Sequence, residues 1–248
     1  SVRYADAVRR VRPAAAPNDP LYAQQWSLPA IGAEAAWAQG AGSPDVTVAV
    51  IDTGILPHPD LAGRLLPGYD FISDAGNARD GDGRDSNPRD EGDWLDDGDC
   101  GGFPSTPSFF HGLFVAGQIA ANTGNGEGIA GLDRAAKILP VRVLGKCGGT
   151  FEDVLEGMLW ASGVPIGGVP ANPHPAKVIN MSLGGYGSCA AAIQEAVDEA
   201  LAQGTVVVVS AGNESDDATS YAPGNCSGVV NVGALSRSGE RASYSNWG

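Results

Sequence analysis

Val46-Thr47-Val48-Ala49-Val50-Ile51 is an apolar, β-branched stretch that ends abruptly at Asp52-Thr53-Gly54. Uninterrupted runs of this kind are typical of a strand that is buried on both faces of a parallel sheet. Further apolar runs follow along the chain, at residues 136–144, 177–182, 205–210 and 228–232. We therefore expect these five runs to be strands of one sheet.

Helical segments separate the predicted strands. Residues 32–39, 112–122, 151–162 and 190–203 have helical character, and Gly204 follows the last of them as a C-terminal cap. Apolar strands that alternate with helices predict an α/β fold: a doubly wound, mostly parallel sheet with helices on both faces.

The composition limits the classes of function. A chain of 248 residues is long enough for one sizeable domain, and its formal net charge is −14. Excess acid argues against nucleic acid and anionic membranes as partners. No apolar run is long enough to span a bilayer. These observations favour an acidic α/β domain that acts on neither DNA nor lipid.

The four cysteines, Cys100, Cys147, Cys189 and Cys226, show no C-x-x-C spacing. An even count without metal-ligand spacing favours two disulfides over a metal site, although four unrelated buried thiols are the alternative. Disulfides would imply an oxidising compartment. Spacing alone leaves all three pairings open.

Polar side chains are expected at the carboxyl ends of the strands, where functional residues of such sheets gather. Asp52 ends a buried strand and therefore needs a partner. Of the three histidines, His58 and His174 lie beside prolines in apparent loops, whereas His111 begins an apolar helix. An Asp52–His111 pair would orient an imidazole as a general base, although structural roles explain either residue alone.

Asn213 follows two small residues after the strand at 205–210. An amide donor with backbone room around it is what an oxyanion hole requires.

Four segments occur in one order, each at a predicted strand end or helix start: Ile51-Asp52-Thr53-Gly54, His111-Gly112-x-x-Val115-Ala116-Gly117, Asn180-Met181-Ser182-Leu183-Gly184-Gly185 and Ser210-Ala211-Gly212-Asn213. Together they resemble the motifs of the subtilisin-like serine proteases (subtilases), over residues 17–248. The resemblance implies a secreted serine endopeptidase that hydrolyses peptide bonds in proteins. By the same resemblance, Asp52 orients the imidazole, His111 acts as general base and then acid, and Asn213 stabilises the oxyanion.

The resemblance also assigns substrate contacts. Two edge segments would sandwich an extended peptide, namely Gly148, Gly149 and Thr150 on one side and Ser182, Leu183 and Gly184 on the other. Ser210, Ala211 and Gly212 would form the other wall of the pocket for the residue before the scissile bond. Turn geometry alone is the alternative explanation for these glycines.

The family's nucleophile lies in a Gly-Thr-Ser-x-Ala-x-Pro segment, which does not occur in the 248 residues. We therefore expect residues 17–248 to be the N-terminal two-thirds of a peptidase domain, inactive alone, whose C-terminal part is supplied elsewhere. Residues 1–16 resemble a propeptide remnant and linker, and the propeptide would be a further partner.

The sequence differs from the family pattern at two positions close to His111. Leu113 stands where the family usually has Thr, and Phe114 stands where it often has His. They favour an alternative function, a non-catalytic relative that binds peptides without cleaving them. An unrelated ligand-binding domain is a third alternative, which the lack of a Gly-rich phosphate loop after the first strand disfavours.

The resemblance further implies a structural calcium site near His58-Pro59-Asp60. Its expected ligands are the side chains of Asp60, Asn125 and Asp19 and the carbonyl groups of Thr123, Glu127 and Ile129. The acidic loop at 74–99 is a weaker calcium candidate, and a solvated loop explains it as well. For the cysteines, the implied pairing is Cys100 with Cys147 and Cys189 with Cys226, in loops near the substrate rim.

Overall fold

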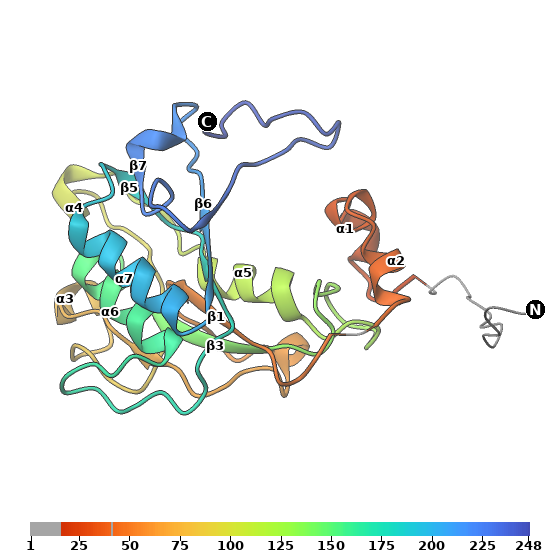
Figure 1. The fold of residues 1–248 in the computed structure, drawn as a ribbon, viewed down its shortest axis with the longest axis horizontal. Helices are drawn as coiled ribbons and strands as arrows, with labels where there is room; N and C mark the ends of the chain where they lie inside the picture. The colour runs from red at the N-terminus through yellow and green to blue at the C-terminus, as the bar shows by residue number, and fades with distance from the viewer. Residues whose placement is uncertain (1–15, 41) are drawn as a thin grey trace, which may run out of the picture.

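A computed structural model describes residues 16–40 and 42–248. Within them, six parallel strands form one sheet in the order β2-β3-β1-β4-β6-β8, with β1 in its interior (Figure 1). The strands are β1 (Thr47–Asp52), β2 (Tyr69–Asp70), β3 (Lys137–Arg142), β4 (Val178–Met181), β6 (Val206–Ser210) and β8 (Val230–Val232). A separate antiparallel pair consists of β5 (Gly185–Tyr186) and β7 (Tyr221–Ala222).

Helices cover both faces of the sheet, so the predicted doubly wound α/β fold is confirmed. The helices are α1 (Ser27–Ala30), α2 (Ala33–Trp37), α3 (Ala75–Ala78), α4 (Asp99–Gly102), α5 (His111–Ala120), α6 (Phe151–Ser162) and α7 (Ala191–Ala202). Short 3-10 turns occur at Tyr22–Gln24, Pro59–Leu61 and Ala218–Ser220. None of the helices in the described part of the chain is long and apolar enough to cross a membrane.

The side chains of β1 explain why helices are needed on both sides. Val48 and Val50 pack into the apolar cluster under α5, whereas Ala49 and Ile51 pack into the larger cluster under α6 and α7. Successive side chains of a strand point to opposite faces of the sheet. A strand that is apolar throughout therefore needs helices packed against both faces. In Figure 1, α6 and α7 lie side by side and α5 lies apart from them.

Most element boundaries agree with the sequence prediction to within a few residues. The expected helix at 151–162 is α6, and the helix at 190–203 is α7. The sequence patterns missed β2, β5 and β7, which have two residues each and are too short to show a period. The segment expected as one long acidic loop contains α3 and ends at α4. The expected propeptide remnant falls almost entirely outside the described residues.

Candidate active site

Asp52 and His111 meet at the carboxyl end of β1. Asp52 is fully buried as the last residue of the strand, and His111 is the first residue of α5. The Nδ1 atom of His111 lies 2.8 Å from Oδ1 and 3.0 Å from Oδ2 of Asp52. With the neutral imidazole donating from Nδ1 to the carboxylate, Nε2 is left as the proton acceptor.

A close contact between backbones makes this pairing possible. A Cβ atom on Gly112 would lie 2.2 Å from the carbonyl oxygen of Gly54, so only glycine allows α5 to start this close to β1. The backbone N–H of Thr53 donates to Oδ1 of Asp52 over 2.8 Å, which fixes the carboxylate. The first residue of α5 and the last residue of β1 are therefore held at a fixed position relative to each other.

The Asp52 carboxylate also sets the protonation of His111. Its hydrogen bond raises the pKa of the imidazole above the ordinary value, against the opposing effect of burial, and the charges of Asp52 and Asp93 add to the rise. His111 remains reachable, because 43% of its side chain is exposed. Such a pair can accept a proton from a nucleophile and stabilise the imidazolium that results.

A cleft of about 600 Å³ opens beside His111. The six residues predicted as substrate edges line it, namely Gly148, Gly149, Thr150, Ser182, Leu183 and Gly184. Asp93, Phe109 and Phe151 line it as well. The cleft thus brings the Asp–His pair together with both main-chain segments.

The remaining predicted residues lie one strand further on. Ser210 ends β6, which pairs with β4, and its hydroxyl donates to the carbonyl oxygen of Leu183 over 3.3 Å. Ala211, Gly212 and Asn213 follow. Asn213 is exposed and does not line the cleft beside His111. The structure therefore gathers Asp52, His111 and the two edges, and sets the 210–213 segment beside them.

Asn246 holds the turn at residues 211–216 in place, and the sequence patterns missed it. It is buried, and its Nδ2 atom donates to the carbonyl oxygen of Ala211 over 2.9 Å and to Oε2 of Glu214 over 2.7 Å. Its Oδ1 atom accepts from the N–H groups of Glu214 and Asp216, both over 3.0 Å. Asn246 thus braces the turn that carries Asn213. It lies in an aperiodic loop, so no sequence signal pointed to it.

The turn has the left-handed backbone that this bracing requires. Gly212 has φ +102°, and a Cβ atom there would lie 2.3 Å from Nδ2 of Asn246. Any larger residue at position 212 would push Asn246 out of place.

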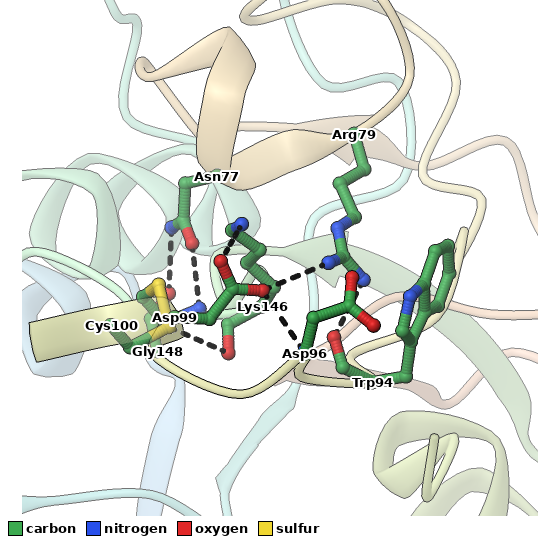
Figure 2. Close-up of a disulfide and its surroundings, with 9 residues drawn as sticks. Asn77, Arg79, Trp94, Asp96, Asp99, Cys100, Lys146 and Gly148 are labelled. Carbon is green, nitrogen blue, oxygen red and sulfur yellow. Dashed lines mark hydrogen bonds and ion pairs between the residues drawn. A yellow bond between two sulfur atoms is a disulfide. The ribbon is translucent and has the colours of Figure 1, made fainter. Parts of the chain in front are cut away.

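The first disulfide ties the cleft edge to the acidic loop. Cys100 and Cys147 are bonded, at a sequence separation of 47 (Figure 2). Asn77 clamps the same edge, because its Nδ2 donates to the carbonyl oxygen of Gly148 over 2.9 Å and its Oδ1 accepts from the N–H of Cys147 over 2.8 Å. The edge at 147–148 is therefore held on two sides.

The second disulfide joins Cys189 to Cys226. Both pairs are those that the family resemblance implied, and the described residues contain no free cysteine. This bond links the segment after β5 to the segment after β7, two strands that pair with each other.

The residues expected to bind calcium do come together. Asp19 accepts from the N–H groups of Gly124 and Asn125, and Asp60 accepts from Nδ2 of Asn125 over 2.8 Å and from the N–H of Ile129 over 3.0 Å. In this structure both carboxylates therefore accept hydrogen bonds from N–H donors of the chain. The side chain of Thr123 donates to the carbonyl oxygen of Gly131, and the N–H of Glu127 donates to Asn125. Calcium binding stays a prediction.

Some carboxylates in and beside the acidic loop contact basic side chains. Arg142 is almost fully buried and contacts Asp70, Asp80 and the carbonyl oxygens of Ala78 and Thr53. Asp99 pairs with Lys146 over 3.0 Å. In the described part of the chain, no group of three or more His, Cys, Asp or Glu side chains is arranged to hold a metal. The contacts of Arg142 and Lys146 tie the loop to β3 and to the segment that follows it.

The sequence model of the subtilase family (peptidase S8) matches residues 43–248. The chain belongs to the subtilase family. The match includes Asp52, His111 and every residue that lines the cleft.

Similar proteins extend this result. The subtilase chain is 50% identical to an extracellular basic protease of Dichelobacter nodosus and 51% identical to an extracellular protease of Xanthomonas campestris pv. campestris, over 100% and 94% of its length. It spans only 42% and 41% of those two proteins. A solved structure of a Pseudoalteromonas arctica protease is 51% identical, with a TM-score of 0.92 over 94% of this chain and 70% of that one. The subtilase fold is thus shown directly.

Proposed function

We propose that a protein containing this chain is a secreted serine endopeptidase that hydrolyses peptide bonds in proteins. Asp52 and His111 would act as two members of its triad, with the serine contributed from outside residues 1–248. The observation that carries the proposal is the Asp52–His111 pair at a cleft bounded by two main-chain edges. The extracellular proteases similar to this chain support it.

In the proposed reaction, Nε2 of His111 takes the proton of the serine hydroxyl and later gives it to the leaving amine. Asp52 keeps Nδ1 protonated and stabilises the imidazolium, because its buried carboxylate is 2.8 Å away. Asn213 is the proposed oxyanion donor, held by the braced turn at 211–214.

The substrate would bind as an extended strand between residues 148–150 and 182–184. Main-chain hydrogen bonds to these edges are sequence-tolerant, which suits an enzyme that cleaves proteins. The side chain before the scissile bond would enter the pocket between residues 182–184 and 210–212. The two disulfides suit an oxidising, extracellular setting. Its own propeptide and the rest of the peptidase domain are the other proposed partners.

The test is covalent labelling of a polypeptide that includes this chain and the remainder of its peptidase domain. A serine-directed fluorophosphonate should label one serine outside residues 1–248, and peptide hydrolysis should disappear with the label. His111→Ala should lose both. His174→Ala is the matched control, because the His174 ring makes no hydrogen bond within the described residues and lies in a loop.

A non-catalytic peptide-binding protein is the rival outcome. Phe114, one helical turn from His111, is 62% exposed and gives the helix an apolar side where the family often has a histidine. Saturable binding of an extended peptide without cleavage or labelling would establish this alternative and reject the endopeptidase.

A further inference from the structure

The cleft contains a carboxylate that the proposed triad does not use. Asp93 is half-buried and lines the cleft together with His111 and both substrate edges. Its Oδ1 atom accepts a hydrogen bond from the N–H of Phe109 over 2.7 Å. Among the described residues, no basic side chain forms an ion pair with it.

The other charges of the cleft are already balanced. Lys146, which also lines it, pairs with Asp99 over 3.0 Å, and His111 is bonded to the buried Asp52. Asp93 is close enough for its charge to raise the pKa of His111. Its negative charge is therefore the one that a bound peptide would meet uncompensated.

The framework around Asp93 fixes where this charge lies. The N–H of its neighbour Trp94 donates to the Ser108 hydroxyl over 3.1 Å, and Leu95 and Thr106 exchange two backbone hydrogen bonds. Figure 2 shows the guanidinium of Arg79 at the Trp94 ring, 3.8 Å from its centroid. A preorganised carboxylate loses little conformational freedom when it binds a partner.

The direction of the peptide decides which of its side chains reaches Asp93. Successive side chains of an extended strand point to opposite sides. If the residue before the scissile bond enters the pocket at residues 182–184 and 210–212, the residue preceding it points to the opposite side. His111 and Asp93 line the same cleft as residues 182–184, and Asp93 is near enough to His111 for its charge to act on the imidazole.

We propose that Asp93 is a specificity-determining residue, which favours Arg or Lys at the second position before the scissile bond. The inference rests on the proposed endopeptidase function and narrows its substrates to peptides with a cationic side chain at that position.

The test compares matched peptides on the protein that contains the whole peptidase domain. One peptide carries Arg at the second position before the cleaved bond, one carries citrulline, which has nearly the same shape without the charge, and one carries Leu. We expect kcat/KM for Arg to exceed that for citrulline by about fivefold at low salt. The ratio should shrink toward one as the ionic strength rises.

Two variants locate the effect. Asp93→Asn keeps an oxygen for the N–H of Phe109 and should reduce the Arg-to-citrulline ratio to about one. Asp97→Asn is the matched control, because Asp97 also accepts a backbone hydrogen bond within this loop, from Ser105 over 2.9 Å, but does not line the cleft. Its ratio should equal that of the wild type.

Hydrolysis of all three peptides at equal rates would overturn the proposal and leave the endopeptidase intact. A preference that survives in Asp93→Asn would also overturn it, because another group would then supply the charge. If none of the peptides is cleaved, including the Leu peptide, the proposed endopeptidase function is rejected, and the inference about Asp93 is rejected with it.

Discussion

The hydroxyl oxygen of Thr53 accepts a hydrogen bond from the N–H of Gly112 over 2.9 Å. The same hydroxyl donates to Oδ2 of the buried Asp90 over 2.6 Å. Thr53 follows Asp52 and Gly112 follows His111, so one side chain joins the neighbours of both triad candidates. The separation of Asp52 and His111 therefore depends on a residue of the cleft wall whose hydroxyl makes both of its hydrogen bonds within the chain.

Thr53→Val tests this positioning role. Valine has nearly the same shape but leaves the Gly112 N–H and the Asp90 carboxylate without their partner, which should cost about 1–3 kcal/mol of unfolding free energy. In the active protein, kcat should fall more than KM changes, and Thr53→Ser should restore most of it. Denaturant unfolding and steady-state kinetics measure both effects. Thr47→Val is the control, because Thr47 is buried in β1 without a side-chain hydrogen bond to the described residues; an equal loss there would contradict the prediction.

Asn246→Ala should destabilise the turn at 211–214. It removes two donors to Ala211 and Glu214 and two acceptor contacts in a buried site, and we expect a loss of about 2–4 kcal/mol. Because Asn213 lies on this turn, kcat should fall further than the loss of folded protein explains, as measured at a temperature where the variant is fully folded. Unchanged kcat in the folded variant would show that the turn needs no brace.

The two disulfides should contribute similar stability but different effects on binding. Their loops of 47 and 37 residues each correspond to about 4 kcal/mol in the chain-entropy description. Replacing Cys100 and Cys147 by Ser should also raise KM for peptides, because Cys147 belongs to the cleft edge. Replacing Cys189 and Cys226 should lower the melting temperature by a similar amount with a smaller change in KM. A larger KM effect from the second pair would count against the edge assignment.

The activity should depend on pH through His111. A general base works in its neutral form, and Asp52 raises the pKa of this imidazole, so kcat/KM should fall as the pH drops below a value higher than that of an ordinary histidine. Asp93→Asn removes a negative charge that contributes to the rise, so the acid limb of the pH–rate profile should move to lower pH. Asp97→Asn should leave it in place, and a shift to higher pH in Asp93→Asn would refute this account.

The sheet could be predicted because its strands repeat a strong local pattern. An unbroken β-branched run such as that of β1 is recognisable without knowledge of its neighbours, and Asp52 and His111 stood out at its end and at a helix start. Their pairing depends on the close approach at Gly112, which the motif order suggested but local patterns could not establish.

The rest of the site depends on contacts between distant loops. Asp93 is one of many acids in its segment, and only the fold separates it from Asp99, which pairs with Lys146. Asn246 acts on a turn some 30 residues earlier in the chain. Neither residue follows a helical or strand period, so neither could be singled out in the sequence.

The buried Arg142 also constrains how relatives of this protein can diverge. Its guanidinium is shared between Asp70, Asp80 and two carbonyl groups, one of them that of Thr53, which follows Asp52 in the chain. Loss of Arg142 alone leaves the clustered Asp70 and Asp80 without a cation inside the domain, whereas replacement of the whole set by apolar residues is tolerable. Positions 70, 80 and 142 should therefore be inherited as a unit, and descendants that change one should change all three.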